Sequence, residues 1–89
     1  MISRTVTIIN RLGLHARAAT RLVNCSSQFQ SEIIIQKGTR SINGKSIMGV
    51  LTLAASPGTD LLIEADGADE EQALESIIRL INNRFGEGE

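Results

Sequence analysis

The sequence contains one histidine, His15, and Arg17 follows it two residues later. His15 stands directly before an Ala/Arg-rich run that predicts a helix beginning at Ala16. The histidine is then the N-cap residue, and the free backbone N–H groups of the first turn lie next to its ring. The helix dipole and Arg17 both disfavour a positive ring at this position. We therefore expect a neutral, nucleophilic imidazole at physiological pH.

This arrangement also favours an anion, because the N–H groups and the guanidinium would stabilise a negative group placed on the ring. It points to a ring nitrogen that attacks a phosphoryl group and holds it as phosphohistidine. A lone histidine near a loop is, however, more often a plain surface residue. A general base in an enzyme would need a second catalytic group. Cys25 lies about three turns further along the helix and no carboxylate is adjacent, so a complete enzyme is disfavoured.

Composition excludes several other functions. The net charge of -1 and the lack of Tyr and Trp argue against nucleic-acid binding. The single cysteine rules out an internal disulfide and, with a single histidine, a Cys/His zinc site. No signal pattern occurs and no apolar run approaches about 18 residues. We expect a cytoplasmic protein with no metal site and no membrane insertion, and a core built from Ile, Leu, Val and Ala.

The elements that position His15 follow from hydrophobic periodicity. Alternating residues predict a strand over 1–9, and three- and four-residue spacing predicts a helix over 16–27. Short β-rich runs at 32–37 and 40–42 predict a hairpin. Ser46 is expected to cap a short helix over 47–54, and 60–65 reads as a strand. Asp69, with Gln72 three residues later, is expected to cap a last helix. The apolar stripe of this helix consists of Leu74, Ile77, Ile78 and Ile81, and Gly86 is expected to end it.

The predicted element order is βαββαβα in a single domain, 1–89. Each amphipathic helix needs one apolar face covered, and strands with one apolar face each can cover them. The pattern therefore predicts an α+β, two-layer open-faced sandwich with the helices on one face of the sheet and water on the other. Apart from the hairpin, the strand order and the pairing directions stay open.

Two separated segments resemble the HPr family, the histidine-containing phosphocarriers of the phosphoenolpyruvate-dependent phosphotransferase system. They are GLHAR at 13–17 and GKSIMGV at 44–50, and the resemblance extends over essentially the whole chain, including Asp69-Glu70-Glu71. It implies a four-stranded antiparallel sheet that carries three helices on one face.

The resemblance also implies roles for residues. His15 would receive a phosphoryl group from enzyme I and pass it to IIA domains, with Arg17 as its charge partner. Ser46 would be a regulatory phosphorylation site of a dedicated HPr kinase/phosphorylase. The protein would be a stoichiometric carrier with no cofactor of its own, and not an enzyme. The family usually has proline where this chain has Ala18, which leaves the rate of transfer open.

A partner surface is expected around the two sites. Its residues would be the start of the first helix, a basic rim and an exposed apolar patch: Ala16, Thr20, Arg21, Lys45, Ile47 and Met48. We expect a monomer, and Cys25 to be a small helical residue rather than a redox thiol. Two alternatives remain: a regulatory phosphorelay for nitrogen or carbon metabolism that moves no sugar, and an interaction module in which His15 only caps a helix.

Overall fold

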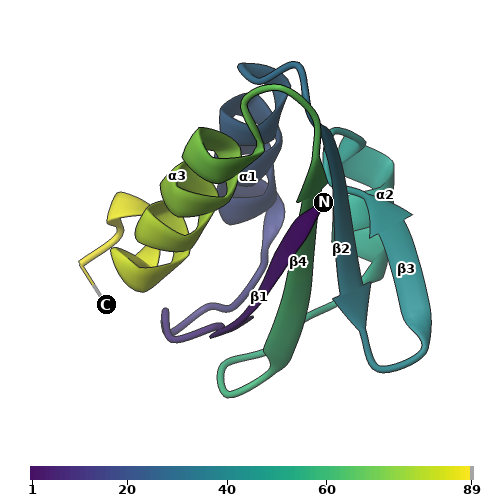
Figure 1. Cartoon of the computed structure of the whole chain (residues 1–89). Coiled ribbons are helices and arrows are strands. Elements are labelled where there is room, and N and C mark those ends of the chain that lie inside the picture. Colours follow the sequence, from purple (N-terminus) through teal and green to yellow (C-terminus); the bar gives the residue numbers. More distant parts are fainter. Residues whose placement is uncertain (89) are drawn as a thin grey trace.

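The computed structural model describes residues 1–88. Its elements confirm the predicted order and add a short 3₁₀ helix at the C-terminal end (Figure 1). Their bounds are β1 Ile2–Thr7, α1 Ala16–Ser27, β2 Glu32–Lys37, β3 Arg40–Asn43, α2 Ile47–Thr52, β4 Asp60–Asp66, α3 Glu70–Asn82 and η1 Arg84–Gly86.

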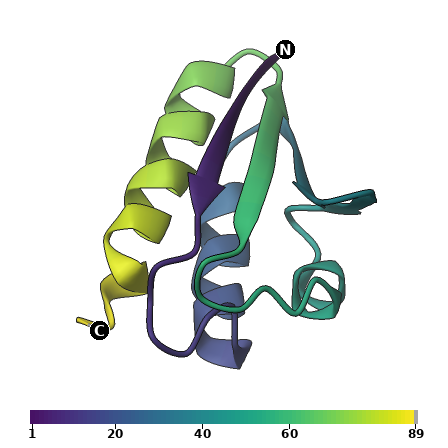
Figure 2. The same ribbon diagram turned by 90° about the horizontal axis from the view of Figure 1, so that it is seen from below.

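The sheet has four strands in the order β1-β4-β2-β3, and every neighbouring pair is antiparallel. The central strand β4 aligns Leu61 with Val6 of β1 and Ile63 with Ile35 of β2. Alternate residues of the two central strands are buried, as a sheet covered on one face requires. The helices cover that face, and the open-faced sandwich is confirmed (Figures 1 and 2).

The core is aliphatic with one exception. Phe85 is fully buried and is the largest buried side chain, although composition pointed to a core of Ile, Leu, Val and Ala alone. The Phe85 side chain enters the core because the chain turns back after α3. Two residues in this turn, Arg84 and Phe85, have left-handed backbone, with φ of +55° and +54°. Those conformations cannot continue a helix, so α3 ends at Asn82 and not at Gly86 as predicted.

Two other predicted elements are shorter in the structure. β1 ends at Thr7, and Ile9 is exposed. The helix that was predicted to reach Ala54 ends at Thr52, because Ala54 takes a left-handed φ of +49°. Ala54 is therefore exposed and outside the predicted apolar face, while Leu53 is buried in its place.

Asp69 is the N-cap residue of α3, but the predicted side-chain cap is wrong. Its carboxylate instead accepts hydrogen bonds from the backbone N–H groups of Gln30 and Ser31, both at 2.9 Å, and from the Ser31 hydroxyl at 2.5 Å. The carboxylate therefore binds donors of Gln30 and Ser31, which are distant in sequence, in place of the helix N–H groups that the capping pattern predicted. These bonds tie the segment before β2 to the start of α3.

We expect Asp69→Asn to destabilise the fold at neutral pH and to flatten its acid dependence. The hydrogen bonds from Ser31 and then from Gln30 hold the pKa of Asp69 below its ordinary value of about 3.9. A lowered carboxyl pKa stabilises the folded state above the unfolded pKa, and this stability is lost as pH falls through the folded pKa. Urea unfolding between neutral pH and pH about 3 should therefore show the wild type and the variant converging in acid.

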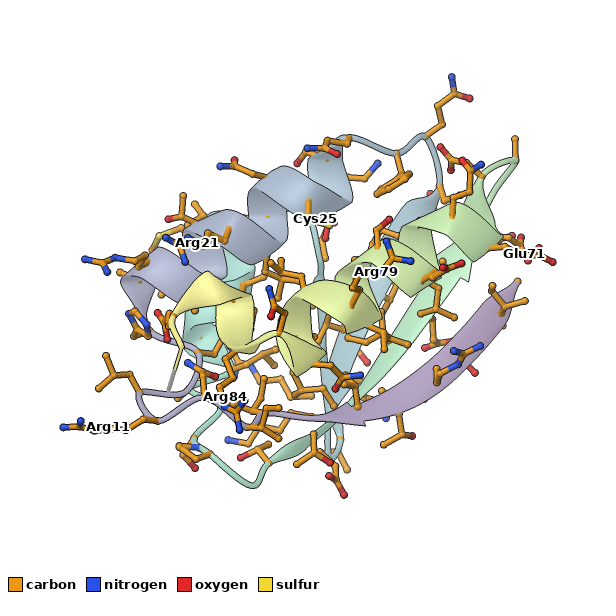
Figure 3. All side chains as sticks on the ribbon, turned by 90° about the vertical axis from the view of Figure 1, so that its left-hand side faces the viewer. Arg11, Arg21, Cys25, Glu71, Arg79 and Arg84 are labelled. Atoms are coloured by element: carbon orange, nitrogen blue, oxygen red, sulfur yellow. The ribbon has the colours of Figure 1, made fainter. Side chains whose placement is uncertain are left out.

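Glu71→Gln is the matched control, because Glu71 is an exposed carboxylate in the first turn of the same helix (Figure 3). It should show less loss at neutral pH than Asp69→Asn. A constant difference between the wild type and Asp69→Asn at all pH values would contradict the assigned role of the carboxylate.

Candidate functional site

The loop between β1 and α1 sets the position of His15. Gly13 has a φ of +68°, and a Cβ there would lie 2.7 Å from the carbonyl oxygen of Ala55. That oxygen accepts the N–H of Leu14 at 2.8 Å, and the Leu14 side chain is buried. Glycine is thus required for close approach of the two segments. The next residue, His15, is extended, with φ of -82° and ψ of -178°.

His15 is the N-cap residue of α1, as predicted. Its carbonyl accepts the N–H of Ala19 at 2.8 Å, but its side chain makes no capping hydrogen bond. The ring is partly accessible, with 28% of the side chain exposed. The first-turn N–H groups have no partner within the helix and so remain available to an anion beside the ring.

Glu87 is a site residue that sequence reasoning missed. Its Oε2 contacts Nε2 of His15, and its Oε1 accepts a hydrogen bond from Nδ2 of Asn10 at 2.9 Å. Burial by itself would raise the pKa of Glu87, but the hydrogen bonds from Asn10 and His15 and the charges of His15 and Arg21 outweigh it and lower the pKa. No local pattern marks a carboxylate that lies 72 residues from its histidine.

The segment that carries Glu87 is anchored at two points. Phe85 is buried in the core, and its carbonyl accepts a hydrogen bond from Nη1 of Arg21 on α1. Backbone hydrogen bonds from Gly86 to Asn83 and from Glu87 to Arg84, both 2.9 Å, hold the turn. In Figure 2 this yellow segment lies beside the purple loop that leads into α1, and Figure 3 shows Arg21 next to it.

A basic pocket of about 310 Å³ lies beside this contact. It is lined by three arginines, one carboxylate and two uncharged residues: Arg11, Leu12, Arg17, Arg21, Gly86 and Glu87. The predicted charge partner Arg17 therefore shares the pocket with Arg21 and with the carboxylate that contacts His15. Among residues 1–88, the guanidinium groups of Arg17 and Arg21 line the pocket beside this carboxylate, and guanidinium groups suit a phosphoryl group.

The second predicted site begins α2. Ser46 is its N-cap residue, and the hydroxyl accepts the N–H of Gly49 at 3.1 Å, so the predicted cap is confirmed. Met48 in the first turn exposes 69% of its surface and Ile47 exposes 37%. Met48 is thus largely open to solvent, whereas Ile47 is open only in part.

The remaining predicted partner residues lie along α1. Ala16 and Thr20 are exposed, and the Thr20 hydroxyl donates to the Ala16 carbonyl at 2.8 Å. Lys45 is held by the carbonyl of Phe29, at 2.6 Å, just past the C-terminal end of α1. Because α1 is about 18 Å long, Lys45 lies at the opposite end of the helix from His15. Arg21 lies closer to His15, since it lines the pocket that also contains Glu87.

Two further residues of α1 were considered from the sequence. Ala18, where the family usually has proline, is the third helical residue and is fully buried. Cys25 is half-buried, and burial raises the pKa of its thiol, which leaves little of the reactive thiolate.

Residues 1–88 contain no group of three or more His, Cys, Asp and Glu side chains that could hold a metal ion. In the same part of the chain, no helix has both the length and the apolar character needed to cross a membrane.

Comparison with known proteins gives concordant results. A family model described as the PTS HPr component phosphorylation site matches residues 2–83. Phosphocarrier protein HPr of Neisseria meningitidis is 49% identical over the full length of both chains. The crystal structure of HPr-C-His from Thermoanaerobacter tengcongensis has a TM-score of 0.95 at 41% identity, and the match covers 98% of each chain. A dimeric HPr structure from the same organism has a TM-score of 0.79 at 41% identity, and that match covers 98% of this chain and 100% of the other. The chain therefore belongs to the HPr family of phosphocarrier proteins of the phosphotransferase system.

Proposed function

We propose that His15 accepts a phosphoryl group from phosphorylated enzyme I and passes it to IIA domains of the sugar phosphotransferase system. The observation that carries this proposal is the position of the only histidine, at the start of α1 and joined through Glu87 to a pocket lined by Arg17 and Arg21. A ring nitrogen attacks phosphorus, and the guanidinium groups and the first-turn N–H groups stabilise the charge.

The exposure of His15 favours a carrier over an enzyme. The ring is partly open at the surface, so a partner protein can bring its own phosphorylated group to it. The described site holds no second nucleophile that would complete a catalytic cycle, and Cys25 lies well along α1. The chain acts as a cytoplasmic monomer without a cofactor, and is consumed and regenerated stoichiometrically.

The direct test is incubation with phosphoenolpyruvate and enzyme I. Intact mass spectrometry should show the addition of one phosphoryl group, lost on acid treatment. The phosphorylated chain is then offered to a sugar-specific IIA domain and to a regulatory IIA-type protein. Transfer to the sugar-specific domain supports the proposal, whereas transfer to the regulatory protein alone shows a regulatory phosphorelay. If no acid-labile phosphate is found, the proposal is wrong and the result favours the interaction module in which His15 only caps a helix.

A partner surface is proposed where α1 meets α2, formed by Ala16, Thr20, Ile47 and Met48, and called here the α1–α2 surface. The two helices pack against each other, and these residues are exposed. Arg17 and Arg21 lie at the His15 end of α1 and Lys45 near its other end. An apolar centre between basic groups suits an acidic partner with an apolar contact.

Met48→Asp should weaken binding to enzyme I by about tenfold or more without loss of stability. Met48 exposes more of its surface than Ile47, the other large apolar residue of the α1–α2 surface. A flexible thioether adapts to several partners, whereas a carboxylate there is desolvated and repels an acidic partner. Isothermal titration calorimetry measures the change. Thr39→Asp, in the exposed turn between β2 and β3, is the control for added charge. Equal affinities of the two variants would remove Met48 from the interface.

Ser46 is proposed as a regulatory site phosphorylated by an HPr kinase/phosphorylase. The N-terminus of α2 tolerates an anion on the cap residue. The same charge stands next to Ile47 and Met48 on the α1–α2 surface and opposes an acidic partner. Phosphorylation should thus leave the fold stable and slow transfer at His15.

The comparison of Ser46→Asp with Ser46→Ala tests this role. Alanine removes the bond to the Gly49 N–H and should cost about 1 kcal/mol, while aspartate keeps a capping acceptor. Ser46→Asp should melt at or above Ser46→Ala yet accept phosphate from enzyme I more slowly. Gln72→Glu, which adds a charge to the exposed first turn of α3, controls for net charge. Equal transfer rates for the two Ser46 variants would leave Ser46 as a cap alone.

A further inference from the structure

Glu87 lies between a buried amide and the ring of His15. Its Oε1 accepts from Nδ2 of Asn10, and the same nitrogen donates to the carbonyl of Gly13 at 2.7 Å. Asn10 is fully buried and keeps this orientation although its Oδ1 has no hydrogen-bond partner within residues 1–88. An unpaired buried oxygen costs free energy. The Asn10 amide therefore donates from Nδ2 to the carboxylate while its Oδ1 is left without a hydrogen bond. Glu87 is thereby fixed in direction, with only 11% of its side chain exposed.

The contact between the Glu87 carboxylate and Nε2 decides which ring nitrogen carries the proton. An ionised carboxylate can only accept hydrogen bonds, so a neutral His15 ring keeps its proton on Nε2. The lone pair then lies on Nδ1, which has no hydrogen-bond partner within residues 1–88. We propose that Glu87 is a positioning residue for phosphoryl transfer, which rests on the proposed function: it holds the Nε2–H tautomer and presents Nδ1 to phosphorus.

The transfer step balances without any further group. The Nδ1 lone pair forms the new N–P bond, while the bond from phosphorus to the donor's leaving atom breaks and its electron pair stays with the donor. No proton leaves His15, so the ring becomes formally cationic with its proton still on Nε2. The neighbouring carboxylate offsets that charge. In onward transfer the N–P pair returns to Nδ1, and the same neutral tautomer is restored.

Among residues 1–88, the charged groups that line the pocket beside the ring come from three segments. Arg17 and Arg21 belong to α1, Arg11 to the preceding loop, and Glu87 to the C-terminal segment. Arg17 and Arg21 offset the repulsion between the incoming phosphoryl group and Glu87. The carboxylate can thus remain on Nε2 while phosphorus is bound at Nδ1.

The test compares Glu87→Ala and Glu87→Gln with the wild type. The ¹⁵N chemical shifts of the His15 ring, measured at pH about 8 where a histidine is neutral, report the tautomer. Glu87→Ala should lose the preference for Nε2–H, and its kcat as acceptor from enzyme I should fall about tenfold to a hundredfold with little change in KM. In Glu87→Gln the amide oxygen should face Nδ2 of Asn10, which can only donate, so the amide NH₂ group faces Nε2 of His15. The ring should then move toward the Nδ1–H tautomer, and kcat should fall at least as far as in Glu87→Ala.

Glu71→Gln is the control for loss of a carboxylate elsewhere and should change neither readout. Unchanged ring-proton signals of Phe85 in the variants show that the C-terminal segment is still in place. An unchanged tautomer in Glu87→Ala, or a kcat equal to that of the wild type, would overturn the proposal. The tautomer is measured without phosphoryl transfer, so a wild-type chain that accepts no phosphate at all contradicts the proposed function and not this assignment.

Discussion

The variant His15→Ala is expected to lose all acid-labile phosphorylation by enzyme I while keeping its fold. His15 is the only histidine in the sequence, so no second imidazole can accept the group. The side chain makes no capping hydrogen bond and is partly exposed. Within residues 1–88, its removal therefore eliminates one side-chain contact, that with Glu87, and for this partly exposed interaction about 1 kcal/mol or less is expected.

Radiolabelled phosphoenolpyruvate with enzyme I measures the loss, and circular dichroism with urea unfolding measures the fold. Arg17→Ala is a useful companion variant, because it keeps the acceptor and removes one stabilising charge from the pocket. It should slow transfer without abolishing it. Acid-labile label that persists in a folded His15→Ala protein would assign the phosphoryl group to another residue.

The second large effect is expected in the C-terminal segment, far from any motif. Phe85→Ala should lower the free energy of unfolding by about 3–5 kcal/mol, because it empties the site of the largest buried side chain. The same residue holds the segment that carries Glu87, and its carbonyl accepts the Arg21 hydrogen bond. Loss of the anchor should therefore also release Glu87 from His15, seen as a change in the ring ¹⁵N signals.

Urea unfolding gives the stability change, and Phe85→Leu is the control that keeps most of the buried volume. Leucine should cost clearly less than alanine and should leave the His15 signals near those of the wild type. Should Phe85→Ala lose less than about 1 kcal/mol, the C-terminal segment would not be docked as described.

Local patterns predicted the parts of this fold that depend on neighbours in sequence. The stripe of α3 is buried at Leu74, Ile77 and Ile81, because helical spacing puts those side chains on one face wherever the helix lies. The Ser46 cap and the N-cap position of His15 were predicted for the same reason, since each involves backbone within four residues. Strand order was left open by the same patterns, because pairing between β1 and β4 joins residues far apart in sequence.

Competition from distant partners explains where the predictions were wrong. Asp69 has the residue type and position of a helix cap, yet Ser31 and Gln30 supply donors that take its carboxylate. The end of α3 was predicted at Gly86 because glycine usually stops a helix. The chain instead leaves the helix at Asn82, since burial of Phe85 requires left-handed backbone before that glycine is reached.

The sequence by itself predicted His15 as the acceptor that we propose for this phosphocarrier, because a histidine at a helix start with an arginine two residues later is a local arrangement. Only the tertiary structure decided what holds that acceptor. Glu87 reaches His15 because Phe85 is buried in a core built from every layer of the fold, and Asn10 meets the same carboxylate across 77 residues of chain. Contacts of that range depend on how helices and strands pack together, and no spacing along the chain encodes them.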